Sequence, residues 1–113
     1  MADFGDTIIE FNKDKGLLKI SGISMMEDAL EFYVETKSKI DGFLSSSATN
    51  LTIEFELTYF NSSSAKQFIQ ILTKLEGDKG NAIWKYPKDH SIMHDRGKEL
   101  EILVDVPFEF IAI

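Results

Sequence analysis

The chain of 113 residues contains no cysteine, which excludes disulfide bonds and thiolate metal ligands. Arg96 is the single arginine, so the chain by itself cannot form a phosphate clamp from several arginines. No segment approaches the ~20 apolar residues that span a bilayer. The first residues, MADFGDTIIEF, carry acids where a secretory signal peptide carries basic residues, so we expect a cytoplasmic protein.

Positive charge is also scarce. The formal net charge is −7, and no stretch is rich in lysine or arginine. Such a surface repels phosphate backbones, so we expect neither nucleic acid nor an anionic membrane as a partner. The lack of a long apolar segment predicts no membrane insertion. Apolar residues are plentiful: 43% hydrophobic and 12% aromatic residues favour one folded domain over residues 1–113. Another protein or a small molecule remains as the partner.

Apolar periodicity and turn signals predict five strands and three helices. The strands are expected at residues 7–12, 17–21, 51–59, 81–86 and 108–113. The first helix is expected to begin at Ser24, because Ser24 and Glu27 have the spacing of a capping box, and to reach Leu44. Leu30 and Tyr33 should belong to its buried stripe. The second helix is expected at about 62–75 and the third at 89 to about 103.

The predicted order is β-β-α-β-α-β-α-β, an α/β fold. An antiparallel hairpin should come first, and each β-α-β crossover should be right-handed and join parallel strands. Apolar and polar residues alternate through 51–59, so only one face of that strand is apolar. We therefore expect a mixed five-stranded sheet with helices mainly on one face. Glu54 and Glu56 should lie on a solvated face rather than form a catalytic carboxylate pair.

Asn61, Ser62, Ser63 and Ser64 fall between the carboxyl end of a central strand and the amino end of the next helix. In open α/β sheets, ligands and chemistry usually sit there. Asn and Ser are also preferred N-caps, so helix capping alone would explain the run. A phosphate on one of these hydroxyls would add about −1.5 to −2 charges, partly neutralised by Lys66, and would change the surface shown to a partner.

Aromatic residues near the strand ends should mostly fill the core. Phe60 is the expected exception, because it lies on the opposite face of its strand from Tyr59 and next to Asn61. The predicted partner-binding residues are Phe60, Asn61, Ser63, Ser64 and Lys66.

The segment from Leu57 to Lys66, LTYFNSSSAK, resembles the signature of the SiaC-like regulatory phosphoproteins of bacteria. The resemblance runs over nearly the full chain. It includes the block from Ser21 to Ser24 with Glu27, the strand Trp84-Lys85-Tyr86, Gly97 in the third helix, and Pro107-Phe108 before the last strand.

The resemblance implies a fold similar to anti-sigma-factor antagonist (STAS-like) domains. It also implies phosphorylation of the hydroxyl residue after the asparagine, which is Ser62 here; local chemistry alone leaves Ser63 and Ser64 as alternates. A dedicated kinase would add the phosphate and a PP2C-type phosphatase would remove it. The unmodified form would bind and activate a diguanylate cyclase with a GGDEF domain, which makes cyclic-di-GMP.

Two other interpretations remain open. One is an anti-sigma-type antagonist with the same switch and a partner in transcription control. The other is a small enzyme or metal protein using His90, His94 and the neighbouring acids. Zinc catalysis requires a third protein ligand, and no catalytic motif is present. We therefore expect a non-enzymatic protein without a cofactor or metal.

Overall fold

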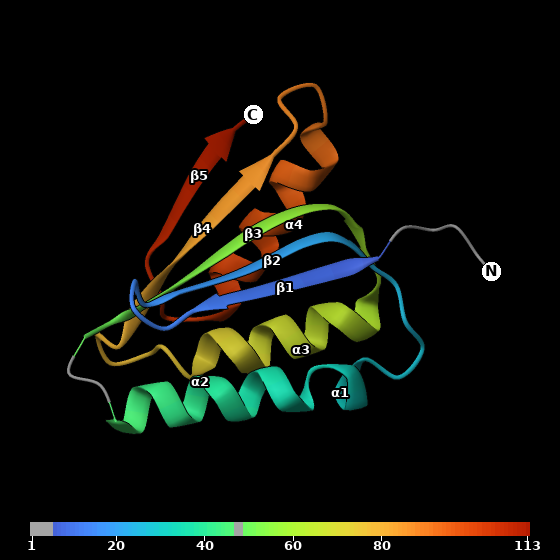
Figure 1. Ribbon diagram of the computed structural model, residues 1–113. Helices are drawn as coiled ribbons and strands as arrows, with labels where there is room; N and C mark the ends of the chain where they lie inside the picture. The colour runs from blue at the N-terminus through green and yellow to red at the C-terminus, as the bar shows by residue number, and fades with distance from the viewer. Residues whose placement is uncertain (1–5, 47–48) are drawn as a thin grey trace.

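The computed structural model describes residues 6–46 and 49–113 as a sheet of five strands with four helices packed on one of its faces (Figure 1). Residues 1–5, which open the N-terminal segment considered above, lie outside the described residues, as do residues 47–48. The elements are β1 (Thr7–Asn12), β2 (Leu17–Ser24), α1 (Ala29–Phe32), α2 (Val34–Ser46), β3 (Leu51–Phe60), α3 (Ser62–Thr73), β4 (Gly80–Tyr86), α4 (Ser91–Leu103) and β5 (Phe108–Ala112).

The strands lie in the sheet in chain order, β1-β2-β3-β4-β5. β1 and β2 are antiparallel and are joined by a short turn that Gly16 closes with a positive φ of 61°. The other three pairings are parallel, as they must be when a helix carries the chain back between consecutive strands. The predicted mixed five-stranded α/β sheet is confirmed.

Aromatic rings fill the space between the sheet and the helices. Phe68 of α3 packs edge-on against Phe55 of β3, with ring centroids 5.2 Å apart, and against Phe60 at 5.3 Å. Trp84 of the neighbouring strand β4 also contacts Phe55 and Phe60. These rings are all buried, so the centre of the core lies beneath the carboxyl half of β3.

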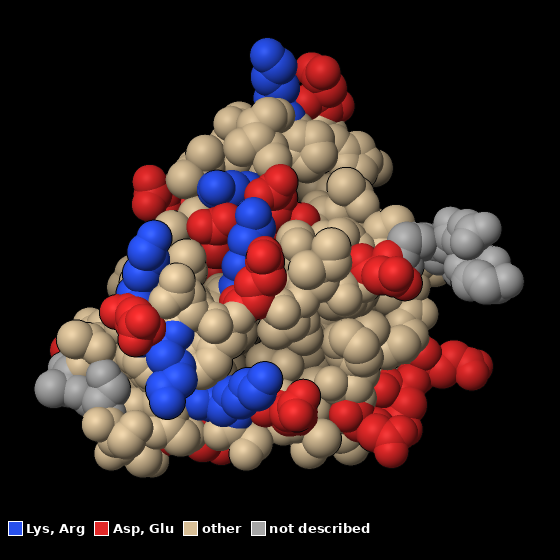
Figure 2. Space-filling view, viewed as in Figure 1, with Lys and Arg blue, Asp and Glu red and all other residues tan. Residues whose placement is uncertain are grey.

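The opposite face of the sheet is charged, as the alternation in β3 predicts. Lys19 Nζ lies 3.2 Å from a carboxylate oxygen of Glu56, and this hydrogen bond raises the pKa of Lys19. Glu54 lies between Lys19 and Lys85, with Lys85 Nζ 3.2 Å away. Figure 2 shows basic and acidic side chains interspersed over these strands. Glu54 is only 9% exposed, so it is less solvated than expected.

The first helix differs from its prediction. Ser24 does not cap it, because Ser24 is the last residue of β2 and pairs with Phe60. Asp28 caps α1 instead, accepting a hydrogen bond from the Glu31 N–H at 3.1 Å. α1 ends after one turn, and Leu30, expected in the buried stripe, is 58% exposed. Pairing with β3 therefore keeps Ser24 in β2, although its spacing from Glu27 matches a capping box.

No helix within the described residues is long and apolar enough to cross a membrane.

Replacing Gly97 by alanine should destabilise the protein. The new Cβ would lie 2.5 Å from Trp84 Nε1 and 2.6 Å from Trp84 Cδ1. Trp84 is fully buried and donates from Nε1 to the Met93 carbonyl at 2.9 Å, so its ring is not free to move. Overpacking of this kind costs about 1–3 kcal/mol, which urea denaturation would measure.

Gly42→Ala is the matched control. Gly42 is also helical, but a Cβ there meets nothing within 4 Å. Alanine should raise the unfolding free energy at this position by about 0.5–1 kcal/mol, because it removes the conformational entropy of glycine. Equal stability of the two variants would show that α4 does not need its close contact with Trp84.

Candidate functional site

Asn61 joins three elements at the end of β3. Its side-chain Oδ1 accepts a hydrogen bond from the Ser64 N–H at 2.9 Å, which makes it the N-cap of α3. Its Nδ2 donates to the Met26 carbonyl at 3.2 Å, and its backbone N–H donates to the Ser24 carbonyl at 3.0 Å. The predicted cap is therefore also a tie between α3 and the segment that follows β2.

Beneath this cap lies a chain of buried hydroxyl groups from Ser24, Tyr33 and Ser64. Ser24 Oγ lies 2.6 Å from Tyr33 Oη and donates to Ser64 Oγ at 2.7 Å; Ser64 Oγ donates to the Ser24 carbonyl at 2.9 Å. Because Ser24 has one hydroxyl hydrogen, Tyr33 is the donor in the first of these bonds. Burial raises the pKa of Tyr33, which keeps its phenol protonated for this role.

The three consecutive serines have three different environments. Ser62 is exposed, and no partner within residues 6–46 and 49–113 bonds its hydroxyl. Ser63 is half-buried and its hydroxyl makes a long bond of 3.4 Å to the Glu27 carbonyl. Ser64 is fully buried in the hydroxyl chain. The structure thus brings Asn61, Ser62, Ser63 and the exposed Lys66 to one surface and places Ser64 beneath it.

The prediction that Phe60 faces a partner is wrong. β3 pairs with β2 through Gly22–Leu57 and Ile23–Tyr59, which leaves Thr58 as an extra residue on β3. This bulge shifts the alternation of side chains by one position. Phe60 consequently turns into the core at 1% exposure, while Tyr59 turns outward at 44%. Ser64 is likewise too buried to contact a partner directly.

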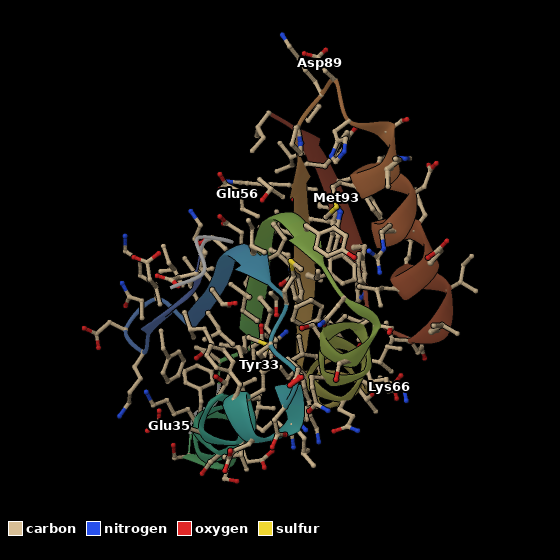
Figure 3. All side chains as sticks on the ribbon, turned by 90° about the vertical axis from the view of Figure 1, so that its right-hand side faces the viewer. Tyr33, Glu35, Glu56, Lys66, Asp89 and Met93 are labelled. Carbon is tan, nitrogen blue, oxygen red and sulfur yellow. The ribbon has the colours of Figure 1, made fainter. Side chains whose placement is uncertain are left out.

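Arg96 is a residue of this region that the sequence did not place. Its Nη1 donates to the Phe60 carbonyl at 2.7 Å, and its guanidinium lies 4.0 Å from the centre of the Phe60 ring. The Tyr59 ring centre is 5.8 Å away. A signal existed in the sequence, because Arg96 precedes Gly97, whose missing side chain indicates close packing of that helix. Figure 3 shows α4 beside the end of β3 and the start of α3.

The histidines do not form a metal centre with other residues of the described chain. Among those residues, no three His, Asp or Glu side chains come together as ligands. His94 bonds Asp95 at 3.2 Å, and its ring packs against Tyr86 and Phe110. His90 occupies the N-cap position of α4 without a side-chain capping bond.

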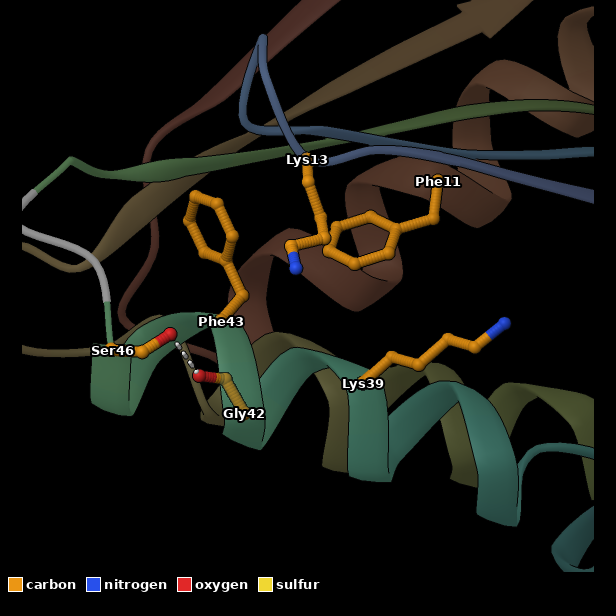
Figure 4. A pocket seen from close by; sticks show the side chains of 6 residues that line it. All are labelled: Phe11, Lys13, Lys39, Gly42, Phe43 and Ser46. Atoms are coloured by element: carbon orange, nitrogen blue, oxygen red, sulfur yellow. Dashed lines mark hydrogen bonds between the residues drawn. The ribbon is translucent and has the colours of Figure 1, made fainter.

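A pocket of about 280 Å³ lies at the other end of the sheet (Figure 4). It is lined by Phe11, Lys13, Lys39, Gly42, Phe43 and Ser46. Phe11 lies near the end of β1 and Lys13 in the turn between β1 and β2, whereas Asn61 follows the carboxyl end of β3. The pocket is therefore separate from the serine run.

Residues 6–113 match the SiaC family of regulatory phosphoproteins. This chain belongs to the SiaC family. The resemblance predicted from the sequence is confirmed, and the match covers every residue of the candidate site.

Solved SiaC structures share the fold of this SiaC-family protein. The crystal structure of apo-SiaC from Pseudomonas aeruginosa superposes with a TM-score of 0.88 at 23% identity, covering 98% of this chain and 94% of that chain. A chain from the crystal structure of the diguanylate cyclase SiaD in complex with its activator SiaC, from the same organism, gives 0.89 at 23% identity, covering 99% and 96%. A comparison with curated proteins found no match.

Asn61→Ala should destabilise this SiaC-family protein by about 1–2 kcal/mol, because it removes the cap of α3 and the bond to Met26. Ser62→Ala is the neighbouring control and should stay within about 0.5 kcal/mol, since Ser62 is exposed. Urea denaturation of both variants would measure the difference. A stable Asn61→Ala protein would show that solvent replaces the cap at little cost.

Alkaline pH should weaken the protein through Tyr33. In the unfolded chain its phenol has a pKa near 10, whereas burial raises the folded value. The stabilisation is therefore complete below about pH 10 and is lost as pH rises through the folded pKa. Tyr33→Phe should cost about 1 kcal/mol at pH 7, since Ser24 loses a donor.

The gap in unfolding free energy between wild type and Tyr33→Phe should stay constant from pH 6 to 9 and narrow above pH 10. Denaturation curves across this range measure the gap at each pH. If the unfolding free energies of wild type and Tyr33→Phe changed in parallel up to pH 11, the buried phenol of Tyr33 would not be the cause of the alkaline destabilisation.

Proposed function

We propose that this SiaC-family protein is a non-enzymatic switch controlled by reversible phosphorylation of Ser62. The observation that carries the proposal is the exposure of the Ser62 hydroxyl beside two serines that are partly or fully engaged. A kinase must bring a hydroxyl into its own active site, which favours Ser62 over the buried Ser64. Ser63 is the remaining alternate, because its bond to Glu27 is long.

Phosphorylation at Ser62 would change the surface without dismantling the fold. Among the residues that the structure describes, none bonds the Ser62 hydroxyl, and the phosphate would add about −1.5 to −2 charges at the first turn of α3. Asn61, Ser63 and Lys66 surround this position. A partner that packs on the unmodified surface would have to bury that charge, and burying an unpaired charge is costly.

The partner that we propose is a diguanylate cyclase with a GGDEF domain, which the unmodified form binds and activates. Support comes from family membership and from the SiaC of Pseudomonas aeruginosa, described as the activator of the diguanylate cyclase SiaD. A dedicated kinase and a PP2C-type phosphatase would set the phosphorylation state. We place this switch in the cytoplasm, with residues 1–113 as the single domain that is phosphorylated and bound by the partner.

Phosphopeptide mapping of the protein from its own host should find phosphate on Ser62. The signal should disappear in Ser62→Ala and persist in Ser63→Ala, the matched neighbour. Phosphate found on Ser63 or Ser64 of the wild-type protein, and not on Ser62, would contradict the assignment of Ser62 as the modified residue. Consistently unmodified serines across growth conditions would contradict the switch itself.

Purification of the protein together with its bound partners tests whether the partner is a diguanylate cyclase. Ser62→Ala should retain a GGDEF cyclase and raise its production of cyclic-di-GMP, whereas protein carrying phosphoserine at 62 should not. Recovery of an anti-sigma kinase in place of the cyclase would instead indicate a partner switch in transcription control.

A further inference from the structure

Arg96 is held at the β3–α3 connection by two contacts that leave its charge uncompensated. One is the bond from Nη1 to the Phe60 carbonyl and the other is the stacking of the guanidinium on the Phe60 ring. No carboxylate among residues 6–46 and 49–113 forms an ion pair with it. An arginine has five N–H donors, and the Phe60 carbonyl takes one of them.

The contact with the Phe60 carbonyl places this guanidinium two residues along the chain from Ser62. Successive Cα atoms are ~3.8 Å apart, so the Cα atoms of Phe60 and Ser62 can be separated by no more than about 7.6 Å. Arg96 Nη1 is 2.7 Å from the oxygen of Phe60. A phosphate on Ser62 would extend beyond the hydroxyl, and rotation of the long side chain of Arg96 would have to supply the rest of the approach.

We propose that Arg96 binds the phosphate of phosphorylated Ser62, so that the modification is fixed to α4 by a charge-assisted pair. This inference rests on the proposed function, because it takes Ser62 as the modified residue. Paired guanidinium donors fit two phosphate oxygens, a geometry that a lysine cannot reproduce. α4 would then respond to the modification together with α3.

Lys66 is the competing cation, four residues after Ser62 on α3. It lies on the same helix face as Ser62, but it is exposed and no ring or carbonyl holds it in place within the described residues. On residues 25–28 and on α4, the other charged side chains are the acids Glu27, Asp28, Asp95, Glu99 and Glu101 and the base Lys98. Lys98 lies over Phe110 and bonds Glu101, so the acids oppose a phosphate dianion and Arg96 is the cation held beside the β3–α3 connection.

Arg96 can be observed directly, because it is the only arginine in the chain. Phosphoserine is installed at position 62 during synthesis, so no kinase is needed. In ¹⁵N-labelled wild-type protein, the Arg96 Nε–Hε signal should shift downfield and exchange more slowly after modification. An unchanged signal would overturn the proposal, and this measurement needs no substitution that could disturb the fold.

The phosphate itself gives a second readout by ³¹P NMR titration. Arg96→Gln should raise the midpoint by about 0.5–1 pH unit, because it removes a nearby cation. Lys98→Gln, which removes the same charge from the same helix, should have little effect, since Lys98 lies over Phe110 and bonds Glu101. Arg96→Lys should fall between wild type and Arg96→Gln.

A midpoint that moves with Lys66→Gln and not with Arg96→Gln would overturn the proposal in favour of Lys66. A failure of this inference can be told apart from a failure of the proposed function. If the host never phosphorylates Ser62, the switch fails while the contact with Arg96 is still measured on the installed phosphate. If the Arg96 signals do not respond, the contact fails while the switch stands.

Discussion

The hydrogen bonds between Ser24 and Ser64 hold the connection between β3 and α3 in place. They join the last residue of β2 to the first turn of α3 beside a core of mainly apolar side chains. A buried hydroxyl without a hydrogen-bond partner costs about 1–3 kcal/mol of folding free energy, so each of these buried hydroxyls requires its hydrogen-bonded neighbours. Tyr33 adds a third hydroxyl from the junction of α1 and α2. Ser62, two residues before Ser64, is therefore exposed on a helix turn that buried hydrogen bonds hold in place.

The helix cap and the proposed phosphorylation site, which compete as explanations of the serine run in the sequence, fall on different residues. Asn61 supplies the cap and Ser64 supplies the buried bonds, so a change at either one removes native interactions. Ser62 supplies neither. Its hydroxyl is consequently the one whose chemistry can change at little cost to the fold, and this separation would allow the proposed regulatory site to sit on a structural junction.

Local sequence patterns predict the features of this fold that depend on local rules. Alternation from Leu51 to Leu57 correctly predicts one apolar and one charged face, because side chains of a strand point to opposite sides. The rule fails at Phe60, since the bulge at Thr58 depends on pairing with β2. The capping box at Ser24 fails for a related reason. Both errors lie where distant segments meet, and both lie at the candidate site.

Close packing of α4 also determines the electrostatics of that site. Gly97 lets α4 approach Trp84 closely. The side chain of the preceding residue, Arg96, extends from α4 near this contact and bonds the Phe60 carbonyl. A side chain at position 97 would push the helix outward and carry the guanidinium with it. In a chain with a net charge of −7, a dianion at α3 would meet mainly repulsion without such a cation. An uncharged glycine would therefore set how much negative charge the junction can accept, because it positions the cation proposed to bind the phosphate.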